Sequence, residues 1–292
     1  MLQDLDQYPT KSVLIGNERF NITGISDSDP YFIEIIDNFE PEFMRFCRDF
    51  MREDDVCIDI GANLGLKTLL FAQHVPNGRV IAVEPSPSVV QLLERNVRGC
   101  GKLNITIVKA AVADIDGTVG FLDDSAWGSI SAGGIRVPVW QLSTLLSELD
   151  LGRVDLVKID VEGYEWPILK NSLDILNQYR TLVLLEFNAW CQIESNNSPK
   201  EFSEWILSNF AHVFMLRREH NSDEGYLERL PRDGATHLLL LTYIGMVQLL
   251  TFLLQITRRG YRSVPPVRCH GRPQHKLFRP KDAWRPRLHG FV

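Results

Sequence analysis

The feature that most constrains the fold is an apolar run that ends in a glycine-rich turn and continues as a helix, VCIDIGANLGLKTLLFA. Its first part, residues 56–60, has the composition of a buried strand. Glycines in the turn let the backbone approach a ligand closely, and the free amides of the helix start face that ligand. A strand, a turn and a helix in this order predict an α/β fold with a ligand site at the turn.

Six further runs with strand composition follow, and helical stretches fit between them. The strands are expected at residues 79–84, 105–110, 154–159, 181–187, 212–216 and 235–241, and the helices near 65–74, 87–99, 141–149, 165–177 and 199–210. This alternation is typical of a mostly parallel sheet covered by helices on both faces, a doubly wound α/β fold. Within residues 111–139, GTVGFL and GIRVPV predict an inserted β-hairpin.

The two ends of the chain differ from this pattern. Residues 1–50 contain a strand pair around SVLIGNERFNI and a helical spacing of apolar residues over 30–51, which predict an N-terminal cap. Residues 244–292 predict an apolar helix and a basic, Pro- and Arg-rich tail that is partly disordered. Because Leu238 to Thr257 carry no charge, a spanning helix is an alternative, as is peripheral membrane contact.

Charge and cysteine usage exclude several classes of protein. The net charge is −6, and the region from Arg258 to Arg287 is strongly basic, so the remaining body is acidic. An acidic body argues against nucleic-acid binding as the main activity. The five cysteines contain no CxxC pair and are interpreted as reduced thiols. The N-terminus lacks an apolar run, which predicts a cytoplasmic location without a secretory signal.

Acidic residues stand at the ends of several predicted strands. Asp59 and Glu84 end the first two, Asp160 and Glu162 follow the fourth, and Glu186 ends the fifth. Open α/β sheets bind ligands at this edge, where Glu84 is placed to accept hydrogen bonds from ribose hydroxyls. The turn reads GANLG and lacks the GxGxxG spacing of dinucleotide sites, and the acids favour a cationic ligand. An NAD(P)-dependent oxidoreductase and a non-catalytic interaction module remain as alternatives.

Five motifs in fixed order carry a family resemblance: DIGANLGLKT, RVIAVEPSPSVVQLLERNV, KAAVADIDGTVGF, VDLVKIDVEGYEWPIL and LLEFN. Over roughly Val56 to Asn188, and more weakly to Leu241, the chain resembles the FkbM family of S-adenosylmethionine-dependent methyltransferases. The resemblance implies a class I methyltransferase with a Rossmann-like, seven-stranded sheet whose last strand is antiparallel. Residues 51–243 would then bind S-adenosyl-L-methionine. The implied reaction is methyl transfer to a hydroxyl of a small molecule, such as a sugar, a glycan or a polyketide-like metabolite.

The resemblance also implies roles for individual residues. Several residues are expected to hold the cofactor. Around its methionine part these are Asp59, Gly61, Asn63 and Gly65, with Thr68 at the helix start. Glu84 is expected at the ribose, the backbone of Ala111 at the adenine, and Asp160 beside the methyl group. Lys67 stands where members of the family often carry an aromatic or small residue. This difference predicts an altered cofactor entrance.

Methylation of an alcohol also needs a base, because a hydroxyl is a weak nucleophile at neutral pH. The candidates are Asp160, Glu162, Glu186 and His220. Each has a structural alternative, such as capping a helix or satisfying nearby amides. No metal site is predicted, although a metal shared by Asp160 and Glu162 is an alternative. Trp127, Trp140, Trp166 and Trp190 are candidates for the acceptor pocket, and Trp190 is favoured among them.

Overall fold

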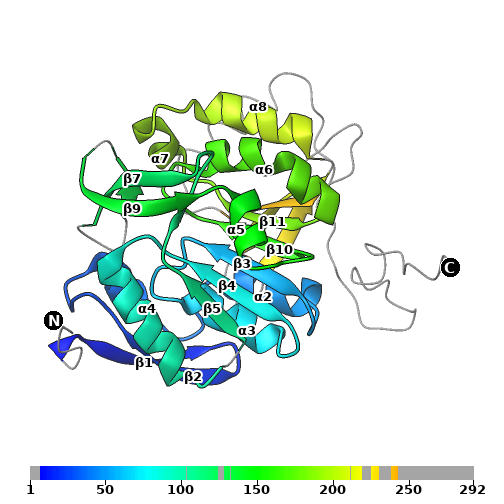
Figure 1. Ribbon diagram of the computed structural model, residues 1–292. Helices are drawn as coiled ribbons and strands as arrows, with labels where there is room; N and C mark the ends of the chain where they lie inside the picture. Colours follow the sequence, from blue (N-terminus) through cyan, green and yellow to red (C-terminus); the bar gives the residue numbers. More distant parts are fainter. Residues whose placement is uncertain are drawn as a thin grey trace, which may run out of the picture.

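The computed structural model describes residues 7–102, 104–123, 128–131, 133–210, 212–218, 225–229 and 238–242. One large sheet carries helices on both faces (Figure 1). Its strands are β3 (Val56–Ile60), β4 (Arg79–Val83), β5 (Ile105–Val108), β10 (Leu156–Ile159), β11 (Leu182–Glu186), β12 (His212–Arg218), β13 (Gly225–Arg229) and β14 (Leu238–Thr242), in the order β13-β12-β14-β11-β10-β3-β4-β5. All seven predicted strands are therefore confirmed.

The expectation of seven strands with an antiparallel last strand is wrong. The described sheet has eight strands. The unpredicted strand β13 pairs antiparallel with β12, whereas β14 runs parallel to both β11 and β12. Because β13 returns the chain to the edge where β12 begins, β14 enters the sheet in the same direction as its neighbours.

The strand order reverses between β3 and β10. From β3 the chain builds outward through β4 and β5, and it then returns to place β10 on the other side of β3. Ligands bind at such a switch point in open α/β sheets, outside the carboxyl ends of the strands. This arrangement therefore places the turn after β3 and the residues after β10 side by side.

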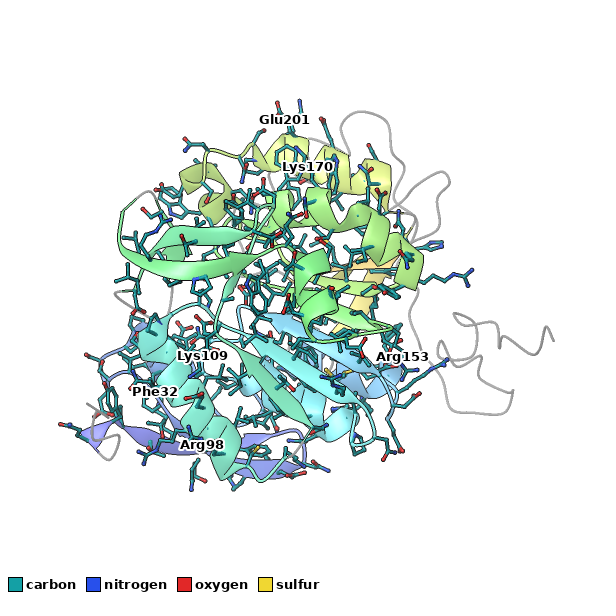
Figure 2. All side chains as sticks on the ribbon, in the orientation of Figure 1. Phe32, Arg98, Lys109, Arg153, Lys170 and Glu201 are labelled. Atoms are coloured by element: carbon teal, nitrogen blue, oxygen red, sulfur yellow. The ribbon has the colours of Figure 1, made fainter. Side chains whose placement is uncertain are left out.

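Helices on the two faces bury alternate residues of the strands. Along one face lie α2 (Pro41–Phe50), α3 (Leu66–His74) and α4 (Pro87–Gly99), and along the other lie α5 (Leu142–Glu148), α6 (Glu165–Tyr179) and α8 (Pro199–Asn209). In β3, Ile58 and Ile60 pack with the second group and Cys57 with the first. Charged side chains such as Lys170, Glu201 and Arg98 lie on the outer surfaces of these layers (Figure 2).

A second, smaller sheet follows β5. Its strands are β6 (Ala111–Val112), β7 (Gly117–Leu122), β8 (Ser129–Ile130) and β9 (Ile135–Trp140), in the order β6-β9-β7-β8. The antiparallel pairing of β7 with β9 confirms the predicted hairpin. This sheet contributes Phe121 and Ile130 to the wall of the main cavity.

The N-terminal segment begins with a hairpin of β1 (Thr10–Ile15) and β2 (Glu18–Thr23). A continuous helix over 30–51 is not formed, because α1 (Pro30–Glu34) and α2 are separated by a loop at 35–40. Proline at position 41 disfavours helical backbone in the residue before it. Asn38 and Glu40 also adopt left-handed φ angles of 50° and 51°, which a continuing right-handed helix does not allow. The break carries this loop to the edge of the cavity.

Asn96 on α4 joins the N-terminal hairpin to the central fold. Its amide donates to the carbonyl oxygens of Thr23 at 3.1 Å and Leu64 at 2.9 Å, and its oxygen accepts from the amide of Thr23 at 2.8 Å. Asn96→Ala would leave these buried backbone groups unpaired, so we expect the free energy of unfolding to fall by about 2 kcal/mol. Chemical denaturation measures this. Asn171→Ala, at an exposed site, should change it little, and equal losses would contradict the prediction.

The predicted apolar helix and basic tail at residues 244–292 lie outside the described residues. Among the helices that are described, none is both long enough and apolar enough to cross a bilayer.

Candidate active site

A cavity of about 1760 Å³ lies at the carboxyl ends of the central strands. Its walls come from the turn after β3, the ends of β4, β10 and β11, the small sheet, and the N-terminal loop that includes Phe39 and Glu40. Ligand pockets in proteins commonly measure roughly 300–1,000 Å³. The cavity is therefore large enough for two small molecules side by side.

The turn after β3 depends on glycine at position 61. Gly61 has a φ angle of +77°, and a Cβ at this position would collide with the backbone carbonyl oxygen of Asp160. The amides of Gly61 and Ala62 both donate to the carbonyl oxygen of Val83 at 3.0 Å. Only a residue without a side chain allows the turn to lie this close to both β4 and β10.

Glu84 ends β4 with its carboxylate in the cavity wall. One carboxylate oxygen accepts from the amide of Asn63 at 2.9 Å and the other from the amide of Ser86 at 3.0 Å. Burial raises the pKa of Glu84 to about 7, although both amides oppose the shift. Each oxygen retains a lone pair, so the carboxylate is suited to accept hydrogen bonds from the hydroxyls of a ribose.

The predicted cofactor residues fall into two groups. Gly61, Asn63, Glu84, Ala111 and Asp160 line the cavity. Asp59 and Thr68 are fully buried and are not part of its wall; Thr68 donates from its hydroxyl to Asp59 at 2.6 Å. Gly65, with a φ angle of +92°, precedes α3 and also lies outside the wall. Asp59 and Thr68 thus support the turn from within the core, and Gly65 closes it by donating to the carbonyl oxygen of Ala62 at 2.9 Å.

Lys158 on β10 belongs to this site although it was not predicted. Its ammonium lies 3.0 Å from Asp59 Oδ1 and 3.1 Å from Asp160 Oδ2, and it donates to the carbonyl oxygen of Gly61 at 3.1 Å. Burial alone would lower the pKa of Lys158, but Asp160 and Asp59 raise it above its usual value. The sequence did contain a signal for this residue, since Lys158 stands inside the apolar run LVKI. A lysine buried in a strand requires acidic partners, so acids are expected beside it.

Asp160 and Glu186 form a hydrogen-bonded carboxyl pair at the ends of β10 and β11. Burial opposes ionisation of Asp160, but Lys158 and Lys67 hold its pKa below the usual value. Burial and the charge of Asp160 together raise the pKa of Glu186 well above the usual range. The opposite shifts make Asp160 the more acidic member of the pair and favour Glu186 as the member that carries a proton.

Lys67 connects the helix after the turn to the N-terminal loop. Its ammonium lies 2.7 Å from Glu40 and 5.5 Å from the ring centroids of both Phe39 and Phe43. Its side chain is only 12% exposed. Burial lowers the pKa of Lys67, and the facing carboxylates, Glu40 foremost, more than compensate for this. This lysine thus ties one wall of the cavity to another.

The remaining predicted residues are less central. Glu162 lines the cavity and accepts a hydrogen bond from the Cys191 thiol at 3.0 Å. Burial raises the pKa of Glu162. His220 and Trp127 lie outside the described residues. Trp190, on α7 (Ala189–Glu194), lines the cavity and is 60% exposed. Trp166 instead stacks on Phe202, with ring centroids 5.3 Å apart.

Comparison with protein families identifies one matching domain. Residues 59–226 match the methyltransferase FkbM domain. The match covers more than half of the 292 residues. It includes the turn after β3, Glu84, Lys158 and the Asp160–Glu186 pair.

Three curated relatives show similarity at low identity. Methyltransferase 1 of Beauveria bassiana is 24% identical, and the alignment covers 42% of this chain and 60% of the relative. Methyltransferase sdnD of Sordaria araneosa is 25% identical over 54% of this chain and 74% of the relative. The hexuronic acid methyltransferase AglP of Haloferax volcanii is 25% identical over 58% and 70%. The chain thus spans less than two thirds of the Beauveria relative.

Among solved structures, the precorrin-6y C5,15-methyltransferase of Geobacter metallireducens aligns with a TM-score of 0.36 and 16% identity. The alignment covers 65% of this chain and 82% of that chain.

Proposed function

Because the chain belongs to the FkbM methyltransferase family, we propose that it transfers a methyl group from S-adenosyl-L-methionine to a hydroxyl of a small molecule. The observation that carries this proposal is one cavity that holds both the Glu84 carboxylate and the ionised Asp160. Acceptors of the sugar, glycan or polyketide-like class are proposed. The name of the Haloferax relative, a hexuronic acid methyltransferase, supports a sugar-like acceptor.

The residues present fit this cofactor. Glu84 would accept from its ribose hydroxyls, the backbone of Gly61 and Asn63 would lie along its methionine part, and Ala111 would border its adenine. The cavity wall carries eight acids against four lysines or arginines among the described residues, which favours a cationic ligand. When bound, the cofactor supplies an electrophilic methyl group on a positively charged sulfur.

Asp160 then supplies the base. Its carboxylate would take the proton that the acceptor hydroxyl loses as the new carbon–oxygen bond forms and the methyl–sulfur bond breaks, with the bonding electrons left on a neutral sulfur, and Glu186 would keep its own proton. Lys158 remains paired with Asp160 while that charge changes. The walls of the cavity orient the acceptor and limit access of water, and orientation is a major source of rate enhancement.

The reaction is tested by incubating the protein with methyl-labelled S-adenosylmethionine and a panel of glycans and hydroxylated metabolites. We expect label on a hydroxyl oxygen of at least one acceptor. Calorimetry with S-adenosylmethionine, S-adenosylhomocysteine and NAD(H) provides an independent readout. Tight binding of the dinucleotide, without binding of the other two, would contradict the proposal.

Cofactor affinity should increase as the pH rises through 7. Glu84 is protonated below its pKa of about 7 in the free protein, whereas ribose hydroxyls donate to its ionised form. Binding therefore releases a proton at pH 6, and the dissociation constant should fall by roughly tenfold between pH 6 and pH 8. Calorimetry in buffers of different ionisation enthalpy measures both the affinity and the proton release.

Glu84→Gln should abolish this pH dependence. Glu165→Gln is a matched control, because burial also raises the pKa of Glu165 to about 7. Glu165 does not line the cavity and accepts instead from the amides of Val161 and Gly163. If the Glu165 variant lost the pH dependence and the Glu84 variant kept it, the effect would belong to Glu165 and the prediction would be contradicted.

A further inference from the structure

One buried ammonium stands between two acids that serve different halves of the site. The ammonium of Lys158 lies 3.0 Å from a carboxylate oxygen of Asp59, beneath the turn after β3. It lies 3.1 Å from a carboxylate oxygen of Asp160, at the proposed site of methyl transfer. The side chain of Lys158 is 5% exposed and that of Asp59 is fully buried. Water therefore cannot replace the ammonium as a partner for Asp59 without a rearrangement of the turn.

We propose that Lys158 is a positioning residue whose charge holds Asp160 as the carboxylate, so that the proton shared by the carboxyl pair resides on Glu186. This inference rests on the proposed function, since it concerns the readiness of Asp160 to accept a proton. It assigns a role to a residue beyond the acids that end the strands.

The charges around Asp160 make this cation decisive. The titratable groups that face it or its partners are Asp59, Glu84, Lys67, Glu40, Tyr31, Glu162, Glu165, Glu186, Cys191 and Lys158. Acids outnumber the two ammonium groups, so the position of each ammonium determines which carboxyl is ionised. Lys67 is already 2.7 Å from Glu40. Lys158 is the ammonium in direct ion-pair contact with Asp160.

A purely structural role is the competing explanation. Lys158 also donates to the carbonyl oxygen of Gly61 at 3.1 Å and so helps to hold the turn. Loss of that bond would reduce activity by a similar factor at every pH. Loss of the charge would instead raise the pH at which Asp160 ionises, and activity would then recover as the pH increases.

The experiment compares Lys158→Met, Lys158→Arg and the parental protein by the pH profile of kcat at saturating S-adenosylmethionine, so that titration of Glu84 during cofactor binding does not set the acidic limb. For Lys158→Met we expect the acidic limb to move upward by at least about one pH unit. Lys158→Arg, which keeps the charge, should retain the parental limb. Lys102→Met is a matched control, since Lys102 pairs with Glu18 at 2.6 Å and does not line the cavity. An acidic limb that stays in place in Lys158→Met would overturn the inference.

A second measurement needs neither turnover nor a folded Lys158 variant. Carbon-13 NMR of labelled carboxyl groups in the parental protein, assigned with Asp160→Asn and Glu186→Gln, reports each protonation state directly. We expect an ionised Asp160 and a protonated Glu186 at pH 7. The reverse assignment would overturn the inference. A failure to methylate any acceptor would count against the proposed function alone, because the NMR readout is independent of it.

Discussion

Asp160→Asn is expected to lower kcat by roughly 10²- to 10⁴-fold, the range for removal of a general base. The amide keeps the size of the side chain but cannot accept the hydroxyl proton. Binding of S-adenosylmethionine should persist, because the Glu84 carboxylate and the turn after β3 are unchanged. Transfer of labelled methyl measures the rate, and calorimetry measures the binding.

Two further variants show whether this loss is specific. Glu186→Gln should retain activity within about tenfold, because Glu186 already carries a proton and the amide also donates a hydrogen bond. Asp174→Asn, at an exposed position on α6, should have the parental rate. If Asp160→Asn bound cofactor normally and transferred methyl at the parental rate, Asp160 would not be the base.

Gly61→Ala should both destabilise the fold and abolish cofactor binding. The substitution imposes a left-handed φ angle on alanine and forces its Cβ against the carbonyl oxygen of Asp160. These two costs together should lower the free energy of unfolding by about 3 kcal/mol. Any relief of the collision moves the turn away from β10 and therefore displaces Gly61 and Asn63, which line the cavity. Denaturant titration and calorimetry measure the two effects.

Gly152→Ala is the matched control. A Cβ at Gly152 meets no atom within 4 Å, and its φ angle lies outside the left-handed region. We expect unchanged cofactor binding and a change in stability within about 0.5 kcal/mol. If both alanine variants bound cofactor equally well, close approach of the backbone at position 61 would not be required.

The central fold could be predicted because its signals are local. The central strands β3, β4, β5, β10, β11 and β12 contain short apolar runs, and two of the connecting helices begin at serine caps, Ser86 before α4 and Ser198 before α8. The direction of β14 could not be predicted in this way. The direction of β14 depends on the polar strand β13, which pairs with β12 and returns the chain. The sequence of β13, GYLER, lacks an apolar run that would reveal it.

The acidic residues of the candidate site were predictable because they end strands. Asp160, Glu84 and Glu186 follow apolar runs, so their position at the sheet edge can be inferred from the sequence. The pairing of Lys158 with two acids and of Lys67 with Glu40 depends on contacts between distant segments. The same applies to Asp59 and Thr68, whose burial beneath the turn is set by packing and not by sequence spacing.

The ion pair between Lys67 and Glu40 joins the matched family domain, which begins at residue 59, to a loop that precedes it. One wall of the cavity is therefore encoded separately from the strand ends proposed to carry the reaction. Mutations in that loop can reshape the space for the acceptor without touching Asp160 or Glu84. After gene duplication, such a division would let descendants acquire new substrates while selection preserves a common chemistry.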